Sequence, residues 1–129
     1  MEASTATALP AKLGAPLQGG IYEGPIIENG QLVHLISAPD DLGEHEWEDA
    51  NKAASDYRGG DLDDWFLPEQ RHLMVAWANN KDGFKPGYHW TSSPCGSNGA
   101  WAVDFENGYV IVNTRDDEFR VRPFRRLSL

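Results

Sequence analysis

The chain has 129 residues and a formal net charge of −9 at pH 7, from 20 acidic and 11 basic side chains. This length fits one domain with a real core, and the negative charge opposes direct binding to a nucleic-acid backbone. The apolar runs are far shorter than the roughly 20 residues that span a bilayer, and the single cysteine excludes an intramolecular disulfide framework and multi-cysteine metal sites.

No basic stretch followed by an apolar one opens the chain, so we expect no secretory signal, synthesis in the cytoplasm and no membrane insertion. Residues 1–18 are rich in Ala, Thr and Pro without a regular period, which is typical of a flexible lead. The sequence therefore predicts one domain over residues 19–129. Two β-type stretches, residues 21–27 and 31–38, flank Asn29-Gly30, and because both turn residues tolerate positive φ this pattern predicts a hairpin.

Two helices are predicted next, at residues 46–58 and 69–79. The first has acids in its first turn, Arg58 near its end and Gly59-Gly60 after it. The second follows Pro68, which suits a first helical turn because its missing N–H would have no partner there. Apolar residues at helical spacing are Trp47, Ala50, Ala53, Ala54 and Tyr57 in the first helix, and Leu73, Met74, Ala76 and Trp77 in the second.

The last third of the chain alternates β-type and turn-forming residues, which predicts antiparallel strands. Asn107-Gly108 is the clearest hairpin turn. Because Pro123 has no N–H, the final strand is expected at a sheet edge or a bulge. The predicted strands are residues 88–92, 100–105, 109–113 and 119–123, and the predicted loops are residues 93–99 and 115–118.

Four short motifs follow one another along this region. They are Trp65-x-Leu67-Pro68 before a helix, Tyr88-x-Trp90-Thr91-Ser92-Ser93, Ala100-Trp101-x-Val103-Asp104-Phe105-x-Asn107-Gly108, and Val121-Arg122-x-x-Arg125. In this order they resemble the Lcl C-terminal domain family, over roughly residues 19–126. The resemblance implies an α+β domain with a C-type-lectin-like fold, in which two helices pack on a mainly antiparallel sheet with a late β-hairpin and with N- and C-terminal strands close together.

The sequence departs from the family pattern at two positions. Glu69 stands where a capping Ser or Thr is usual, and we expect it to weaken the cap of the second helix. His72 stands where an acid usually precedes the leucine.

Members of this family occur in phage, prophage and bacterial surface proteins. The resemblance implies a non-enzymatic binding module, phage- or prophage-encoded, that recognises a host protein or a glycan and is associated with the virion. Fold alone gives no ligand, so the site is sought in the late loops, residues 80–85, 93–98 and 114–118. The candidate contact residues are Asn80, Lys81, Asp82, Ser93, Ser97, Asn98, Arg115, Asp116 and Asp117.

The charge distribution supports a second hypothesis. Residues 40–64 contain ten acids against Lys52 and Arg58, a net charge of −8. A small acidic phage protein could inhibit a host defence complex in the host cytoplasm by occupying its basic nucleic-acid-binding surface. The proposed acidic face consists of Asp61, Asp63 and Asp64. The acidic segment could also pair with the late arginines, within the chain or across a homo-oligomer interface. These arginines are Arg120, Arg122, Arg125 and Arg126.

The residue types give little evidence for a catalytic site or a metal site. Cys95 cannot supply the pair of active-site cysteines used by the oxidases of related lectin-like fold, and as a nucleophile it would need a nearby base such as His72 or His89. Residues 61–64 could offer carboxylates to calcium but lack the EF-hand pattern. We therefore expect no enzyme and no cofactor, with calcium kept as an alternative. Trp90, Trp101, Tyr109 and Phe119 are expected in the core rather than in a sugar-stacking platform.

Overall fold

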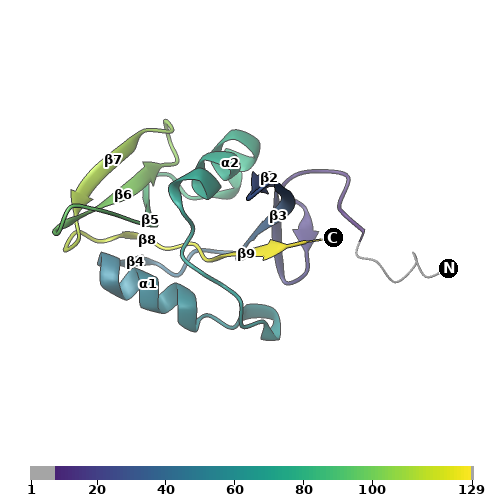
Figure 1. Cartoon of the computed structure of the whole chain (residues 1–129), viewed down its shortest axis with the longest axis horizontal. Coiled ribbons are helices and arrows are strands. Elements are labelled where there is room, and N and C mark those ends of the chain that lie inside the picture. The colour runs from purple at the N-terminus through teal and green to yellow at the C-terminus, as the bar shows by residue number, and fades with distance from the viewer. Residues whose placement is uncertain (1–7, 129) are drawn as a thin grey trace.

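The computed structural model describes residues 8–128 and has two helices and two sheets, which confirms the α+β class (Figure 1). The helices are α1 (Trp47–Asp56) and α2 (Gln70–Asn80), with single turns of 3-10 helix at Gly59–Asp61 and Lys81–Gly83. The strands are β1 (Pro16–Leu17), β2 (Gly20–Glu28), β3 (Gln31–Ser37), β4 (Glu44–His45), β5 (Tyr88–Cys95), β6 (Gly99–Asp104), β7 (Val110–Thr114), β8 (Phe119–Arg120) and β9 (Phe124–Leu127). One sheet has the order β1-β2-β3-β9 and the other the order β4-β8-β5-β6-β7, so two sheets replace the single one expected.

The first sheet is built on the predicted hairpin. Strands β2 and β3 pair antiparallel, and Asn29 and Gly30 make the turn with φ values of 51° and 76°. Strand β1 adds to β2 by pairing Leu17 with Gly20, and the Leu17 side chain is buried. The predicted lead of residues 1–18 therefore contains a strand of the sheet in its described part, and the domain begins before residue 19. Residues 1–7 of that lead lie outside the described residues.

The second sheet contains the late hairpin, β6 and β7, as predicted. The predicted loop at residues 93–99 is wrong in extent, because β5 continues to Cys95 and only residues 96–98 turn. The register of β5 against β6 shifts between Trp90 and Pro94. A bulge there accommodates Pro94, which has no N–H to donate to a regular ladder.

The predicted final strand, residues 119–123, is wrong as a single element. Strand β8 pairs with β4 and, through Arg120, with β5 of the second sheet. Residues 121–123 then cross to the first sheet, where β9 pairs antiparallel with β3. Val121 and Phe124 are both fully buried, so the crossing segment runs through the core between the sheets.

Both helices are confirmed, with shifted ends. Helix α1 stops at Asp56, since Tyr57 is already extended with φ −65° and ψ 136°. Helix α2 begins at Gln70, so Pro68 lies before the cap and not in the first turn. At this cap Glu69 and His72 have capping-box geometry, in which the Glu69 N–H donates to His72 Nδ1 at 3.0 Å.

The main core lies where α2 packs against β2, β5 and β6 (Figure 1). Trp90 is fully buried in a second cluster beneath α1, as predicted. Tyr109 is 63% exposed, which contradicts its expected core position, because it precedes β7 at the edge of the sheet. Within residues 8–128 no helix is long and apolar enough to cross a membrane.

Candidate functional site

Two of the three predicted binding loops meet at one end of the molecule. The β5–β6 turn and the β7–β8 turn lie beside the first turn of α1 and enclose an open hollow of about 500 Å³. We call it the turn hollow. Its lining residues are Glu48, Ser97, Asn98, Thr114, Arg115 and Asp116. Five of these six belong to the loops chosen from the sequence, and Glu48 was not foreseen.

Arg115 holds the walls of the turn hollow together. Its backbone N–H donates to the Asn98 carbonyl and its carbonyl accepts from the Trp47 N–H, both at 2.9 Å. Its guanidinium donates to the carbonyls of Gly99 and Gly96, both at 3.0 Å, and stacks over the Trp47 ring at 4.4 Å. Arg115 was predicted as a contact residue, and its side chain instead joins the β5–β6 turn, the β7–β8 turn and the start of α1.

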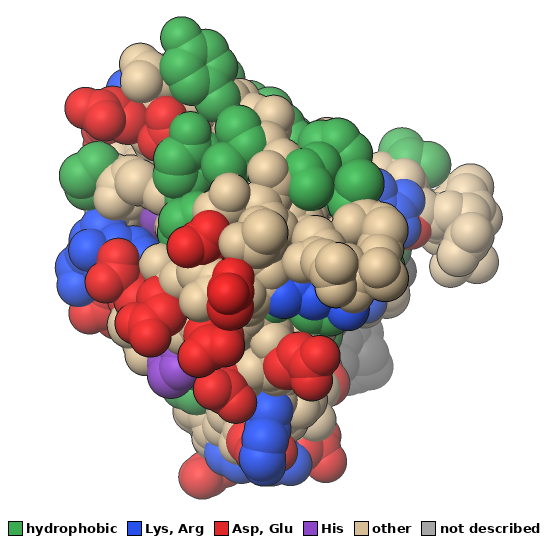
Figure 2. Space-filling model, turned by 90° about the vertical axis from the view of Figure 1, so that its left-hand side faces the viewer, with side chains coloured by type: hydrophobic (Ala, Val, Ile, Leu, Met, Phe, Trp, Pro, Cys, Tyr) green, Lys and Arg blue, Asp and Glu red, His purple; other side chains and the backbone are tan. Residues whose placement is uncertain are grey.

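Acidic side chains surround the turn hollow. Glu48 and Asp116 line it, and Glu46 and Asp49 line a neighbouring hollow of about 260 Å³ that shares Glu48, Arg115 and Asp116 with it. We call these four side chains the acidic rim. Figure 2 shows acidic side chains gathered across the middle of this end of the molecule. Asp117 is less available, because its carboxylate accepts hydrogen bonds from Asn113 and Thr114 and so fixes its own turn. The hollow thus favours ligands that present hydrogen-bond donors or positive charge.

The acidic face predicted at Asp61, Asp63 and Asp64 is reduced by an internal ion pair. Arg125 donates to both Asp64 oxygens, at 2.8 and 3.1 Å, which holds the pKa of Asp64 below its usual value. This pair realises the expected attraction between the late arginines and the acidic segment. Asp61 and Asp63 remain exposed. In the described part of the chain these carboxylates do not gather closely enough to hold an ion.

The third predicted loop lies away from the turn hollow. Asn80 ends α2 and donates to the Glu23 carboxylate at 3.3 Å, while Lys81 and Asp82 are exposed in the 3-10 turn after it. Ser93 is not in a loop, because it belongs to the bulged part of β5, where its N–H donates to Thr91 Oγ1 at 3.1 Å. None of these four residues lines the turn hollow.

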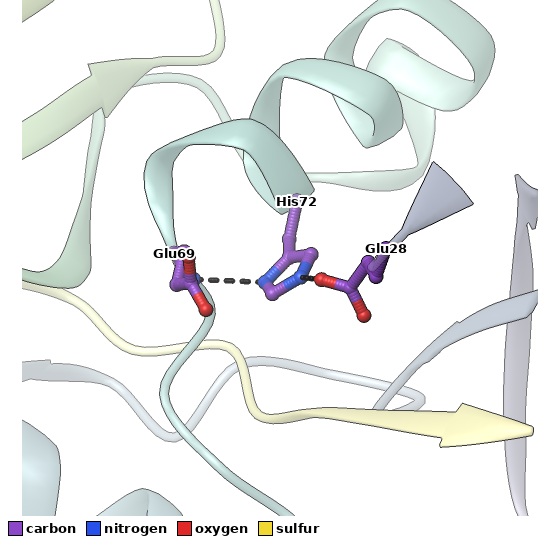
Figure 3. Close-up of side chains that lie close together, drawn as sticks. All are labelled: Glu28, Glu69 and His72. Carbon is purple, nitrogen blue, oxygen red and sulfur yellow. Dashed lines mark hydrogen bonds and ion pairs between the residues drawn. The ribbon is translucent and has the colours of Figure 1, made fainter. Parts of the chain in front are cut away.

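A cluster that the sequence did not indicate joins β2 to α2. Glu28, Glu69 and His72 are the only three acid, histidine or cysteine side chains in residues 8–128 close enough to hold a metal ion (Figure 3). The Glu69 N–H donates to His72 Nδ1, so the hydrogen of the neutral ring lies on Nε2, which donates to Glu28 Oε2 at 2.7 Å. Both ring nitrogens are therefore used, and neither is free to bind a metal.

The carboxylate of Glu28 is also fully engaged. Arg126 Nε contacts Oε1 at 2.6 Å and Arg71 Nη2 contacts Oε2 at 2.8 Å. The hydrogen bond from Arg126, aided by His72, lowers the pKa of Glu28 to about 2, against a smaller opposing effect of burial. Burial lowers the pKa of His72 below its usual value. Two guanidinium groups oppose a cation at this position, so the cluster is an ion-pair network that fastens α2 to the β2–β3 hairpin.

A second buried polar group lies on β2, beside the end of α2. Glu23 is fully buried, and its Oε2 accepts from Ser37 at 2.7 Å, while Oε1 has no partner among the described residues. Burial raises the pKa of Glu23 to about 7. His89 is also fully buried, with Nδ1 donating to the Gly87 carbonyl at 3.1 Å, and burial lowers its pKa to about 4. Neither side chain reaches solvent, so neither can contact an external ligand.

Arg122 lies between these two titratable groups, in the segment that crosses from β8 to β9. It donates to the Ala38 carbonyl at 2.6 Å and to the Gly83 carbonyl at 3.0 Å, and stacks over Phe84 at 4.3 Å. Its charge favours the ionised form of Glu23 and disfavours that of His89. A glutamate inside an apolar strand was the one sequence signal that could have pointed to this cluster.

Cys95 lies at the end of β5, half-buried beside a hollow of about 390 Å³ that borders the turn hollow. His72 and His89, the bases considered for it, are fully buried and do not line that hollow. The described geometry therefore brings no base to this thiol.

Comparison with known sequences adds no family to this geometry. No family model matches the chain, and no curated protein matches it. The resemblance to the Lcl C-terminal domain family thus rests on the motifs alone, and any function must be argued from the site.

Proposed function

We propose that the chain is a non-enzymatic binding module that recognises a protein or a glycan through the turn hollow. The observation that supports this is the meeting of residues 96–98 with residues 114–116 and the first turn of α1 around one open hollow. Because Arg115 already holds these walls together, a ligand would order little further backbone on binding. Pre-organisation of this kind is typical of recognition surfaces built from loops on a rigid scaffold.

We further propose that the fold is C-type-lectin-like and that the chain is a phage or prophage member of the Lcl C-terminal domain family. Three features support this reading. The helices number two, the late hairpin β6–β7 belongs to the sheet that presents the hollow, and β9 joins the early strands β1, β2 and β3 in one sheet. Function does not follow from the fold, so the turn hollow remains the basis of the proposal.

The acidic rim favours some classes of ligand for the turn hollow over others. Glu46, Glu48, Asp49 and Asp116 would repel an anionic glycan and attract a surface rich in Lys and Arg. Asn98 adds an amide that can both donate and accept hydrogen bonds. A basic protein surface, or a neutral glycan with many hydroxyl groups, fits this set better than an acidic polysaccharide.

The test compares two double substitutions that add positive charge to the intact protein. Asn98→Arg with Asp116→Lys places cations in the turn hollow, and Asp61→Lys with Asp63→Lys makes a charge change of similar size on an exposed loop outside it. Binding is measured on a glycan array and on bacterial envelope and lysate fractions. The hollow variant should weaken binding at least about tenfold, or about 1.4 kcal/mol, and the control should stay near wild type. A blank screen for the wild type, or equal loss in both variants, contradicts the proposal.

The acidic rim also supports the second hypothesis, an inhibitor that covers the basic nucleic-acid-binding surface of a host defence complex. Such binding should weaken as salt is raised from about 50 to 200 mM, because screening shortens the range of attraction. Nucleic acid should compete with the protein for the same surface. Reversing Glu48 and Asp49 together without loss of binding to such a complex would exclude this alternative, since both lie exposed at the start of α1.

A further inference from the structure

The outer edge of β7 is an unpaired strand edge. Strand β7 is the last strand of the second sheet, and β6 pairs with it in unbroken register from Gly99↔Thr114 to Val103↔Val110. No other strand in residues 8–128 pairs with its outer side. This edge lies outside the turn hollow for most of its length, and only Thr114 belongs to both surfaces.

The ladder shows which backbone groups of β7 are unpaired. At its start the Asp104 N–H donates to the Tyr109 carbonyl at 2.8 Å. In an antiparallel ladder, hydrogen-bonded pairs alternate with pairs whose N–H and C=O point away from each other. Counting along the unbroken register, Val110, Val112 and Thr114 direct their backbone groups outward. The Thr114 carbonyl already accepts from the Asp117 N–H at 3.1 Å, so the unpaired groups are both of those of Val110 and Val112 and the N–H of Thr114.

The edge also lacks the usual devices that prevent strand pairing. Its sequence, VIVNT, has no charge and no proline, and its pairing with β6 has no bulge. Tyr109 and Val112 expose 63% and 43% of their surface, and Figure 2 shows hydrophobic side chains in the upper part of this end of the molecule. Edges in monomeric proteins are normally blunted by charge, proline or bulges, so this edge is suited to a further strand.

We propose that β7 pairs antiparallel with β7 of a second copy of this chain, about a two-fold axis at Val112. The axis places Val112 opposite itself and Val110 opposite Thr114, and these are the residues whose backbone groups point outward. The strand can therefore form about four new backbone hydrogen bonds with itself, two between the Val112 residues and one from each Thr114 N–H to a Val110 carbonyl. The interface is isologous, as most homodimer interfaces are.

The side chains are self-complementary in the same arrangement. On one face a Val–Val pair lies between two Val–Thr pairs, which places β-branched side chains opposite one another. On the other face Ile111 lies opposite Asn113, whose amide donates to Asp117 in its own chain. No charged residue of the strand faces a like charge. This match to its own sequence is the reason to choose a second copy as the occupant over an unrelated extended peptide.

The net charge of the chain predicts how self-association depends on salt. Each copy has a net charge of −9, so two copies repel each other, while the paired strands themselves are uncharged. Added salt screens the repulsion and leaves backbone hydrogen bonds and apolar contacts in place. Self-association should therefore strengthen with salt, opposite to the response of a basic partner bound at the acidic rim.

The first test is sedimentation velocity of the full chain over a concentration series, at about 0.15 and 0.5 M NaCl. The wild type should be in monomer–dimer equilibrium, with the dimer favoured at the higher salt. Val112→Lys sets two ammonium groups face to face on the axis and should weaken the dimer at least about tenfold. Leu32→Lys is the matched control, since Leu32 is a 54% exposed apolar residue of β3 in the other sheet, and it should dimerise as the wild type does. A monomer at every concentration, or a dimer unaffected by Val112→Lys, overturns the proposal.

The second test is a cross-link in a Cys95→Ser background, which removes the single native thiol. Directly opposed hydrogen-bonded residues lie with Cα atoms about 5.5 Å apart, within the range that a disulfide spans. Val112→Cys should therefore form a covalent dimer on mild oxidation much faster than Leu32→Cys. Equal rates for the two variants would show that β7 does not lie on the axis, and the proposal would fail.

Discussion

Glu23→Gln should uncover a pH dependence of folding stability that the wild type conceals. Glu23 is fully buried and has a pKa of about 7, against 4.5 for an ordinary glutamate. Between pH 4.5 and 7 the folded state binds more protons than the unfolded state. The free energy of unfolding therefore falls with rising pH, and the contribution is lost once the pH passes 7. A shift of 2.5 pKa units corresponds to a fall of about 3 kcal/mol over this window.

His89 acts in the opposite direction. Its pKa is about 4 in the folded protein and 6.5 when exposed, so the unfolded state binds more protons between these values. The free energy of unfolding then rises by about 3 kcal/mol from pH 4 to 6.5. His72, whose pKa is also lowered, adds to the rise, while the lowered pKa values of Glu28 and Asp64 act below pH 4.5. The opposed contributions of Glu23 and His89 overlap, so the wild type should change little between pH 4.5 and 6.5.

The assay is urea unfolding followed by tryptophan fluorescence from pH 4.5 to 8, on wild type, Glu23→Gln and His89→Gln. The glutamine at position 23 keeps an oxygen that accepts from Ser37, and its amide does not titrate. A pH-independent loss of stability from the substitution therefore does not change the slope of the free energy of unfolding against pH. Stability of Glu23→Gln should rise with pH, gaining about 3 kcal/mol on the wild type by pH 7, and that of His89→Gln should fall. A wild-type-minus-Glu23→Gln difference that stays constant across this range refutes the reasoning.

Three further predictions concern the site and its supports. Arg115→Ala removes two hydrogen bonds and the contact with Trp47, and should lower the free energy of unfolding by about 2 kcal/mol in chemical denaturation. Arg115→Lys should recover little of this loss, because lysine lacks the planar fork. Glu28→Gln should destabilise by about 2 kcal/mol near neutral pH, since the guanidinium groups of Arg71 and Arg126 lose their buried carboxylate partner and keep only Glu69. Because the folded pKa of Glu28 is lowered to about 2, this difference should vanish as the pH falls from 4.5 to 2, and a difference that persists there would contradict the assignment. Calcium at about 1 mM should leave the melting temperature unchanged, because residues 61–64 do not gather their carboxylates; a rise that EDTA reverses would contradict this.

Local chemistry explains which elements could be predicted. The Asn29-Gly30 turn and the two helices depend on residues close together in sequence, and each was found with small errors at the ends. The cap of α2 shows the limit of residue-type rules. By residue type Glu69 is a poor capping residue. The structure shows that its backbone N–H donates to the ring Nδ1 of His72, which residue-type rules do not predict.

Long-range pairing explains what could not be predicted. The alternation from Phe119 to Pro123 predicts one strand. Only the pairing of β8 with β4 and of β9 with β3 shows that the C-terminal segment divides between the two sheets. The turn hollow also depends on long-range contacts. Its loop residues could be identified from composition, but the way the loops come together could not. Their meeting with Glu48 depends on the contacts of Arg115 across the chain. Asn80 does not line the turn hollow, because its side chain donates to the Glu23 carboxylate. This contact is also long-range, so the local sequence does not indicate it.

The division of residues 119–127 between both sheets has a consequence for synthesis on the ribosome. Strand β8 lies between β4 and β5, and β9 completes the sheet of β1, β2 and β3, so both sheets gain a strand only when this segment emerges. A nascent chain that ends before Phe124 leaves a void in the core and an unpaired β3 edge. Folding is therefore expected to follow translation of this segment, and a product truncated at residue 118 should be removed by proteolysis rather than accumulate as a partly active fragment.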